Sequence, residues 1–405
     1  MRKKILIGLL MMISVTTYAA QCWLAVDAGS TGNRIFVYKI KNQPTGIPDI
    51  KVKYMYKDFA PLAKLNSAAD AGSVMSDLLN KASDAVNKNC SEGKPNIKVS
   101  VLATAGMRNL EKEAGSEVIK AIYNAIVTAI ENAGFAVGDV GTLLGKYEGV
   151  YAWIGANYLN DSLKNGGGSY GIVEMGGASS QIAFSTKSTG ETTEVVGGNS
   201  HKDYVYSISY LGLGQNDARI SMRNNNHTWT DCYPSGNYQG DVLVNSTGYN
   251  LDGCINNYKT VMSDYSSLKE IRNIDIKKFN KTNFYGLSSI PGNLINFFWI
   301  SDPTKIKEKW KAILGDKCIG KSYDEMNKIK YNEIALSEQC ANATYEYMFL
   351  YGNEDTDNSL HIADGKLFPV FTINGIELNW TLGYLYQKIT NPYKPTAEEI
   401  VGKNH

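Results

Sequence analysis

The sequence has few of the residues from which proteins build imidazole or thiolate metal centres. Its four histidines, His201, His227, His361 and His405, lie in polar or terminal stretches, and no Cys-x-x-Cys pair or Cys/His cluster is present. We therefore do not expect histidine chemistry or a thiolate metal site. The 41 basic and 40 acidic residues nearly cancel, with a formal net charge of +1. No basic face indicates a nucleic-acid duplex as a partner.

Long apolar runs are also missing, apart from one near the N-terminus. Arg2-Lys3-Lys4 precedes an apolar run over residues 5–15, and the small residues Ala19-Ala20 follow. This order is typical of a signal peptide over residues 1–20, and the run is shorter than the roughly 20 residues that a membrane-spanning helix needs. We therefore expect a secreted or periplasmic protein without a stable membrane anchor.

Six cysteines in an exported chain indicate disulfide bonds rather than metal ligands. Only the even count is evidence, because six cysteines allow fifteen pairings. As a hypothesis, the order along the chain suggests three bonds: Cys22 with Cys90, Cys232 with Cys254, and Cys318 with Cys340.

No low-complexity linker divides the chain, although 405 residues are too many for one ordinary core. Two domains are therefore expected, and a repeat indicates where they lie. The apolar residues 22–26 lead into Asp27-Ala28-Gly29-Ser30-Thr31-Gly32 and then into an apolar segment at 34–38. Later, residues 170–173 lead into Glu174-Met175-Gly176-Gly177-Ala178-Ser179-Ser180.

Both copies have an acid at the end of a strand, followed by a glycine turn with hydroxyl side chains. Glycine lets consecutive backbone N–H groups point at one anion. A single turn of this kind is more often an ordinary β-hairpin. Two copies predict two similar halves that face each other across a cleft and hold a polyphosphate between them.

Strand-like and helix-like segments alternate between the two turns. Helical periodicity is present at residues 71–86 and again at 115–133, where the apolar positions begin at Val118, and residues 97–103 read as a strand. This alternation predicts an α/β fold. Residues 224–302 are rich in Asn, Tyr and Ser with weak periodicity, which predicts loops and short elements.

An isolated acid, Glu148, stands where a further apolar helix begins. A phosphate site that uses water as the nucleophile needs a base, and a carboxylate near the terminal phosphate can take the water proton. The alternative is a first-turn acid that only interacts with the helix dipole.

The motifs together resemble those of the apyrases, or nucleoside triphosphate diphosphohydrolases. Five segments occur in the order of the family's conserved regions: Asp27-Ala28-Gly29-Ser30-Thr31-Gly32, Ala103-Thr104-Ala105-Gly106-Met107-Arg108, residues 143–158, Glu174 to Gln181, and Tyr210-Leu211-Gly212-Leu213-Gly214. The segment Trp380-Thr381-Leu382-Gly383-Tyr384 resembles a sixth. The resemblance spans most of the mature chain.

The resemblance implies two ribonuclease-H-like domains of the actin-like superfamily, with a cleft between them. The expected division is residues 21–146 plus about 381–405 for domain I and residues 147–380 for domain II. The implied enzyme is a secreted hydrolase that strips terminal phosphates from nucleoside triphosphates and diphosphates to give monophosphates, with Mg²⁺ or Ca²⁺.

The family's functional residues transfer to matching positions of this sequence. By this resemblance Glu148 is the general base, and Ser179 and Gln181 hold the attacking water. The phosphate-binding residues are Gly29, Ser30, Thr31, Arg34, Gly176, Gly177 and Ala178. The cation is held mostly through water by Asp27, Thr104, Glu174 and Trp380. The family usually has Asp where this chain has Glu174, and the extra methylene moves the carboxylate by about 1.5 Å.

Two other functions remain open from the sequence. An exopolyphosphatase-like hydrolase of the same superfamily shares the two phosphate turns. A secreted nucleotide-binding protein without turnover would use the same scaffold, although it would not need to keep Glu148, Ser179 and Gln181.

Overall fold

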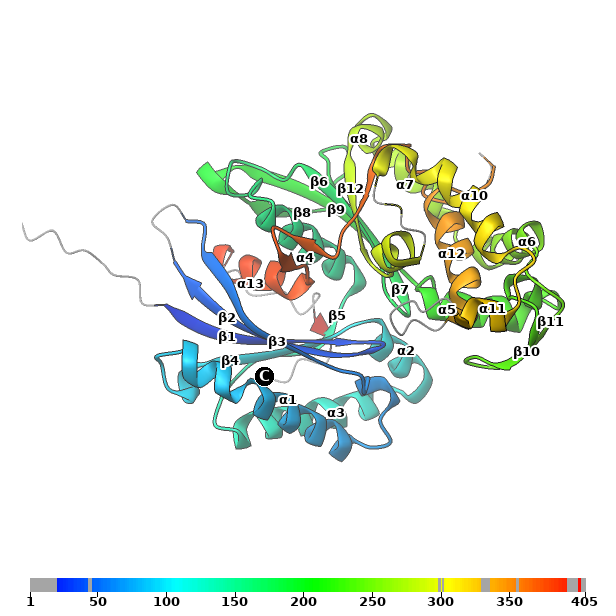
Figure 1. Cartoon of the computed structure of the whole chain (residues 1–405). Helices are drawn as coiled ribbons and strands as arrows, with labels where there is room; N and C mark the ends of the chain where they lie inside the picture. Colours follow the sequence, from blue (N-terminus) through cyan, green and yellow to red (C-terminus); the bar gives the residue numbers. More distant parts are fainter. Residues whose placement is uncertain are drawn as a thin grey trace, which may run out of the picture.

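Two six-stranded sheets organise the protein into two lobes (Figure 1). The computed structural model describes residues 20–42, 46–297, 300, 302–328, 336–354, 357–391 and 400–401. The expected signal peptide, apart from Ala20, lies outside these ranges, and so does His405.

The first sheet has the strand order β16-β5-β4-β1-β2-β3. Its strands are β1 (Gln21–Gly29), β2 (Gly32–Lys41), β3 (Asp49–Asp58), β4 (Lys98–Ala103), β5 (Ala136–Leu143) and β16 (Ile400–Val401). The strands β1, β2 and β3 form an antiparallel meander, and β4 and β5 run parallel to β1. Because alternate residues face opposite sides of a strand, Leu24 and Val26 pack against α1 (Ala68–Asn89) and α3 (Ser116–Asn132). Ala25 belongs to the core on the other face.

The second sheet repeats this arrangement, with the order β13-β12-β6-β7-β9-β8. Its strands are β6 (Tyr170–Met175), β7 (Ser179–Ser185), β8 (Thr192–Val196), β9 (Lys202–Leu211), β12 (Asn283–Ser288) and β13 (Leu367–Pro369). Again three antiparallel strands, β6, β7 and β9, are followed by two strands parallel to the first. The strand pair β1 and β2 therefore corresponds to β6 and β7. The two similar halves predicted from the glycine turns are confirmed.

Two helices, α4 (Gly145–Leu159) and α13 (Trp380–Thr390), lie between the two sheets (Figure 1). A Cβ atom on Gly383 would lie 1.9 Å from the carbonyl oxygen of Tyr151, so only glycine allows the two helices to approach so closely. The hydroxyl of Tyr38 on β2 lies 2.7 Å from that of Thr381, which ties α13 to the first sheet. This packing places the start of α4 between the two lobes.

The other helices and short elements complete the lobes. The helices are α2 (Ala105–Ala114), α5 (Gln215–Asn225), α6 (Leu251–Met262), α7 (Ser267–Ile274), α8 (Ile276–Lys281), α9 (Ser289–Pro291), α10 (Ile306–Cys318), α11 (Tyr323–Lys328) and α12 (Leu336–Leu350). The single-turn segments are η1 (Leu62–Lys64), η2 (Lys94–Asn96), η3 (Gly198–Ser200), η4 (Trp229–Cys232), η5 (Gly292–Phe297) and η6 (Pro303–Lys305). Two hairpins are formed by β10 (Gly236–Gln239) with β11 (Leu243–Ser246), and by β14 (Thr372–Ile373) with β15 (Ile376–Glu377).

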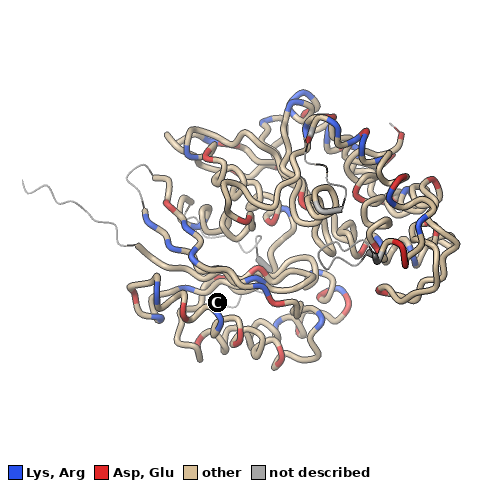
Figure 2. The backbone as a smooth tube through the Cα atoms, viewed as in Figure 1, with Lys and Arg blue, Asp and Glu red and all other residues tan. Residues whose placement is uncertain are grey.

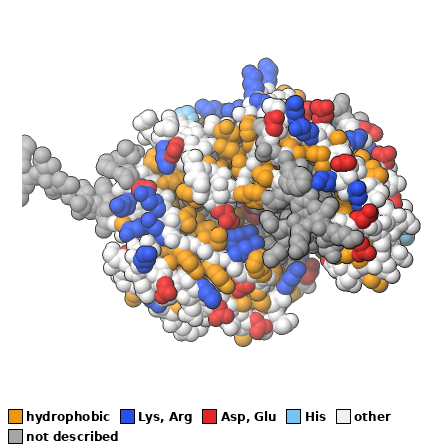
Figure 3. Space-filling model, in the orientation of Figure 1, with side chains coloured by type: hydrophobic (Ala, Val, Ile, Leu, Met, Phe, Trp, Pro, Cys, Tyr) orange, Lys and Arg blue, Asp and Glu red, His pale blue; other side chains and the backbone are white. Residues whose placement is uncertain are grey.

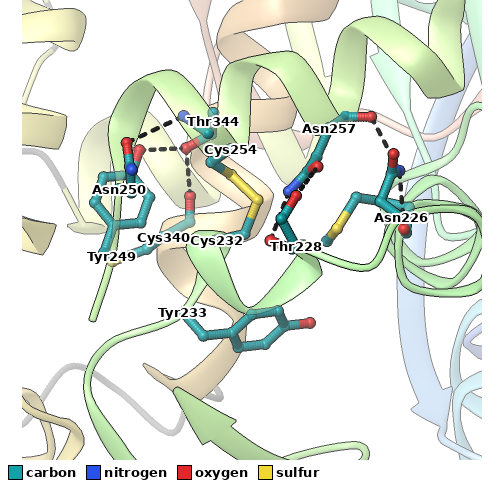
Figure 4. The surroundings of a disulfide bond; sticks show 12 residues. Asn226, Thr228, Cys232, Tyr233, Tyr249, Asn250, Cys254, Asn257, Cys340 and Thr344 are labelled. Carbon is teal, nitrogen blue, oxygen red and sulfur yellow. Dashed lines mark hydrogen bonds between the residues drawn. A yellow bond between two sulfur atoms is a disulfide. The ribbon is translucent and has the colours of Figure 1, made fainter. Parts of the chain in front are cut away.

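All three disulfide bonds have the suggested partners: Cys22–Cys90, Cys232–Cys254 and Cys318–Cys340. Figure 4 shows the second, which joins η4 to α6. Beside it, the amide of Asn257 donates to the carbonyl of Thr228, and the hydroxyls of Tyr249 and Thr344 lie 2.7 Å apart. The disulfide and these hydrogen bonds connect η4, α6 and α12, which pack into one core of the second lobe.

One predicted apolar position was wrong. Val118 is 42% exposed, whereas Ile122, Ile126 and Ile130, which continue the same helical spacing, are buried. Residues 224–302 form short elements as predicted: the helices α6, α7 and α8 have 6–12 residues, and the strand β12 belongs to the second sheet. Their buried positions include Cys254, Asn257 and Tyr258, so the usual aliphatic periodicity is weak.

Lys and Arg are interspersed with Asp and Glu along the backbone of both lobes (Figure 2). This mixture agrees with the near-zero net charge. Among the described residues, no helix has both the length and the apolar character that crossing a membrane requires.

Candidate active site

The first glycine turn joins β1 to β2 as a tight hairpin. Gly29 pairs with Gly32, and Asp27 pairs with Arg34 across the two strands. Gly32 has φ +145°, and a Cβ atom there would lie 2.2 Å from the carbonyl oxygen of Asp58. Glycine is therefore required to turn the chain at this point, and the turn presents Ser30 at its tip.

The second turn joins β6 to β7 and is held by α5. The N–H of Gly176 donates to the carbonyl of Ser179 within the turn. From the first turn of α5, the N–H of Gln215 donates to the carbonyl of Gly176 at 2.8 Å, and that of Asn216 to the carbonyl of Gly177 at 2.9 Å. These hydrogen bonds fix the backbone of the loop before any ligand binds.

The two turns face each other across the gap between the lobes. A Cβ atom on Gly177 would lie 2.7 Å from Ser30 Oγ and 2.7 Å from Thr31 Cγ2. The backbone of the second turn therefore packs against the side chains of Ser30 and Thr31 in the first turn. This contact leaves little room for a side chain at position 177.

A cavity of about 320 Å³ opens beside this contact. Its walls come from both sheets and both central helices: Asp27, Gly29, Ser30, Thr31, Arg34, Thr104, Glu148, Glu174, Met175, Gly176, Gly177, Gln215, Asn216, Ser288, Ser289 and Trp380. Every residue predicted to bind the cation lines this cavity, as do all the predicted phosphate-binding residues except Ala178. Ala178 lines a neighbouring cavity on the far side of Ser30 and Gly177. Figure 3 shows acidic and basic side chains together in the hollow between the lobes.

Glu148 lies in the first turn of α4 and is 7% exposed. Its Oε2 accepts a hydrogen bond from Arg108 Nη2 at 3.0 Å. Burial raises the pKa of Glu148 above its ordinary value, and the guanidinium of Arg108 lowers it again in part. The carboxylate is therefore available in the cavity and has one fixed partner that favours its ionised form.

Ser179 and Gln181, on β7, lie directly beside this carboxylate. Gln181 Nε2 is 2.6 Å from Ser179 Oγ and 3.3 Å from Glu148 Oε2, and it also contacts Ser209 Oγ at 2.9 Å. Arg108 Nη2 donates to Ser179 Oγ at 3.1 Å. The three predicted catalytic residues thus form one hydrogen-bonded cluster, although Ser179 and Gln181 stand behind the cavity wall rather than in it.

Asp27 is held on the first sheet by two partners. Arg34 Nη1 lies 3.3 Å from Asp27 Oδ2, and Asn379 Nδ2 donates to the same oxygen at 2.9 Å. Asn379 also caps α13, because its Oδ1 accepts the N–H of Thr381. The side chain of Asn379 therefore links Asp27 to the helix that carries Trp380.

Glu174 is the acid that replaces the expected aspartate, and it has a single hydrogen-bond partner. Ser288 donates to its Oε1 at 2.8 Å, whereas its buried Oε2 has no hydrogen-bond partner in the described part of the chain. Burial and the charges of Glu148 and Asp27 raise the pKa of Glu174.

Asp27, Glu148 and Glu174 therefore place carboxyl groups around one cavity that also holds Thr104, and these oxygen donors suit Mg²⁺ or Ca²⁺. Among the described residues, no three His, Cys, Asp or Glu side chains are grouped as direct metal ligands. Sparse acids around a cavity suit a cation that keeps several of its waters.

Several site residues were not assigned from the sequence. Arg108 belongs to a recognised motif and lies four residues, or about one helical turn, after Thr104. This spacing was a signal that both side chains face the candidate active site. Asn379 directly precedes Trp380, but an N-cap residue in isolation does not indicate a ligand site. Ser209 and Ser288 were not assigned to the site, because only the pairing of β7 with β9 and of β6 with β12 brings them there.

Comparison with known proteins gives a family match over nearly the whole chain. Residues 18–395 match the family described as GDA1/CD39 (nucleoside phosphatase). The nucleoside-triphosphatase ntp-1 of Caenorhabditis elegans is 26% identical over 402 residues, which cover 88% of this chain and 71% of that protein. Ectonucleoside triphosphate diphosphohydrolase 6 of Homo sapiens is 31% identical over 208 residues, or 48% of this chain and 41% of the human protein.

Solved structures with low sequence identity share the fold. A nucleoside triphosphate hydrolase of Neospora caninum superposes with a TM-score of 0.61 at 14% identity and covers 94% of each chain. A Ppx/GppA phosphatase of Aquifex aeolicus superposes with a TM-score of 0.50 at 14% identity, covering 91% of this chain and 99% of that one. The predicted two-lobed α/β architecture is confirmed.

Proposed function

Since the chain belongs to the GDA1/CD39 (nucleoside phosphatase) family, we propose that it removes terminal phosphates from nucleoside triphosphates and diphosphates and releases monophosphates. One observation carries this proposal beyond the family. The two glycine turns meet at Gly177 and Ser30, and the cavity beside them contains Glu148. The proposed phosphate-binding turns and the proposed base therefore line the same cavity.

In this proposal the two turns and Arg34 bind the phosphates. Backbone N–H groups of Gly29, Gly177 and Ala178 and the hydroxyls of Ser30 and Thr31 supply donors to the phosphate oxygens. Gly176 shapes the turn, because its own N–H donates to the carbonyl of Ser179. Arg34 adds a charged donor from the β2 side of the cavity. Phosphoryl transfer to water needs positioning and charge neutralisation more than covalent chemistry, and these groups supply both.

Glu148 acts as the general base on the attacking water. A water between Glu148 and the terminal phosphorus would donate its proton to the carboxylate as the new P–O bond forms, while the bond to the leaving oxygen breaks. Ser179 and Gln181 would orient this water. Gln181 Nε2 also lies 3.3 Å from Glu148 Oε2 and 2.6 Å from Ser179 Oγ, which holds the three side chains together. General-base assistance typically contributes about 10²- to 10⁴-fold in rate.

Asp27, Thr104, Glu174 and Trp380 would hold a divalent cation, mostly through water. The unpartnered Oε2 of Glu174 and the raised pKa of that carboxyl support this assignment, because a cation would relieve the repulsion among neighbouring acids. When bound, Mg²⁺ or Ca²⁺ would neutralise charge on the phosphate oxygens.

We further propose that the protein is exported and divided as its sequence predicts. Its three disulfides are typical of proteins that fold in oxidising compartments, which supports a secreted or periplasmic location with residues 1–20 as the signal peptide. The two sheets support a domain I of residues 21–146 plus about 381–405 and a domain II of residues 147–380.

Phosphate release from a substrate panel tests the function. We expect release from ATP and ADP but not AMP, with added Mg²⁺ or Ca²⁺ and not with a chelator. Faster release from inorganic polyphosphate than from ATP would favour the exopolyphosphatase alternative. ATP binding without phosphate release would favour a non-catalytic nucleotide-binding protein.

A further inference from the structure

Glu346 is a fully buried carboxyl group that the proposed reaction does not use. It lies on α12 and has 0% exposure. Its Oε1 is 2.7 Å from Ser289 Oγ, and its Oε2 has no hydrogen-bond partner among the described residues. Ser289 in turn lines the candidate active site, so Glu346 stands one residue behind the cavity wall.

The single hydroxyl proton of Ser289 determines which protonation state of Glu346 fits the two contacts. Ser289 Oγ lies 3.0 Å from the carbonyl oxygen of Met175 as well as 2.7 Å from Glu346 Oε1. A hydroxyl has one proton, and a carbonyl only accepts. If Ser289 donates to Met175, the proton between Ser289 and Glu346 must belong to Glu346. Both contacts are hydrogen bonds only when Glu346 is a neutral acid.

This chain of hydrogen bonds ends at the second phosphate turn. Met175 directly precedes Gly176, and its carbonyl belongs to the last residue of β6. The residue before Ser289, Ser288, has φ 61° and ψ −109°, a conformation that is strained for a side chain other than glycine. That strained residue donates to Glu174 Oε1. The hydrogen bonds of Ser289 with Glu346 and with the Met175 carbonyl, together called the tether below, therefore hold both the loop after Met175 and the strained backbone at Ser288.

We propose that Glu346, in its neutral form, is a positioning residue that fixes Ser289 against Met175 and so holds one wall of the phosphate site. This role deepens the proposed function and rests on it. If Glu346 is ionised, its carboxylate would accept the hydrogen bond of the Ser289 hydroxyl. Ser289 would then no longer donate to the carbonyl of Met175. Glu346 thus acts through Ser289 and does not itself touch substrate.

The surroundings of Glu346 favour the neutral acid. Burial raises the pKa of Glu346 to about 7, although hydrogen bonds from the side chains of Ser289 and Asn293 act in the opposite direction. The adjacent Tyr345 donates its hydroxyl to the carbonyl of Leu213. One turn earlier on α12, Asn342 faces Arg219 of α5, whose guanidinium is paired with Asp241 at 3.2 Å. On the β6 side, the nearest acid beyond Met175 is Glu174, which is bound to Ser288.

The test compares Glu346→Gln with Glu346→Ala and the parent. An amide donates to Ser289 at every pH, so Glu346→Gln should keep the parent's kcat/KM for ATP at pH 6. The parent should lose activity as the pH rises through about 7 because the tether is broken, and Glu346→Gln should lack this inflection. Glu346→Ala should be about tenfold less active than Glu346→Gln at every pH, as expected for the loss of one buried hydrogen bond. Glu338→Gln, on the same helix, is the matched control, because Glu338 accepts the N–H of Asp241 instead.

Thermal unfolding provides a readout that does not depend on activity. A carboxyl with a raised pKa in the folded state stabilises the protein fully below its unfolded pKa, and this contribution is lost as the pH rises through the folded value. The Tm of the parent should therefore fall relative to that of Glu346→Gln between about pH 4.5 and 7, and the difference should then stay constant. Ser289→Ala should remove most of the kinetic difference between the parent and Glu346→Gln.

The outcomes separate the two proposals. Absence of ATP hydrolysis in the parent, with the Tm difference present, would overturn the proposed function and leave the neutral acid in place. Identical pH profiles and identical Tm curves for the parent and Glu346→Gln would overturn the role of Glu346. Equal losses of kcat/KM in Glu346→Gln and Glu346→Ala at pH 6 would also overturn the role of Glu346. The amide would then have failed to replace the neutral acid.

Discussion

Arg108 Nη2 lies 3.0 Å from Glu148 Oε2, and both side chains are largely buried. The two residues are 40 positions apart, and they meet because α2 and α4 begin at neighbouring strands of the first sheet. Arg108 also donates to Ser179 Oγ and to the carbonyl of Leu143, so a single guanidinium orients the base and one of its neighbours. This pairing lowers the pKa of the Glu148 carboxyl, which burial raises, and so favours the ionised form that a base needs.

Replacing Arg108 with Met should therefore change the pH dependence as well as the rate. Arg108 lowers the pKa of Glu148, so its loss raises that pKa further. Since the base works only when ionised, the acid limb of the kcat profile should move to higher pH. We expect kcat at pH 7 to fall by about tenfold or more, from the lost charge-assisted hydrogen bonds. Steady-state kinetics from pH 5 to 9 measure this change.

Arg272 on α7 provides the matched control for that substitution. Arg272→Met should leave the acid limb in place. An unchanged acid limb in Arg108→Met would show that the guanidinium does not set the ionisation of the base.

Gly177→Ala tests the contact between the two glycine turns. The new Cβ would lie 2.7 Å from Ser30 Oγ and from Thr31 Cγ2, so these side chains or the turns that carry them must move. We expect weaker binding of ATP with cation, by about tenfold, because a shift of the loops misplaces several phosphate donors. Gly190→Ala is the control, because its Cβ meets no atom within 4 Å. Calorimetric titration with a non-hydrolysable ATP analogue measures both. Equal affinities would contradict the assignment of this contact to the phosphate site.

Glu174→Asp tests the cation site. The shorter side chain should draw its carboxylate away from Ser288, which now donates to Oε1 at 2.8 Å. Since Mg²⁺ demands stricter geometry than Ca²⁺, we expect the ratio of the two activation constants to change. Phosphate release is measured against the concentration of each cation, with the exposed Glu131→Asp as control. The same ratio in parent and variant would remove Glu174 from the cation site.

The Cys232–Cys254 bond should contribute stability without contributing chemistry. It closes a loop with a sequence separation of 22 residues, for which chain entropy gives about 3 kcal/mol. The double Ala variant should lose about that amount in free energy of unfolding by urea denaturation, with kcat for ATP unchanged. A large loss of kcat in the still-folded variant would show that this disulfide also shapes the active site.

The sequence predicted the parts of the site that are local in the chain. Two glycine turns after strand-end acids were enough to predict two facing halves, because a turn is encoded by its own residues. The same holds for Glu148 at the start of α4.

What the sequence did not predict depends on pairing between distant segments. Ser209 reaches Gln181 only through the register of β7 with β9, and Ser288 reaches Glu174 through β6 with β12. The helix α6 was predicted only as a short element of unspecified type, because its buried face includes Cys254, Asn257 and Tyr258.

The role of Glu148 is the central claim, and Glu148→Gln tests it most directly. The amide keeps the shape and the contact with Gln181 but cannot accept the proton of water. We predict that kcat for phosphate release from ATP falls about 10²- to 10⁴-fold, while affinity for a non-hydrolysable ATP analogue stays the same. A variant that releases phosphate at the parent's rate would contradict the account.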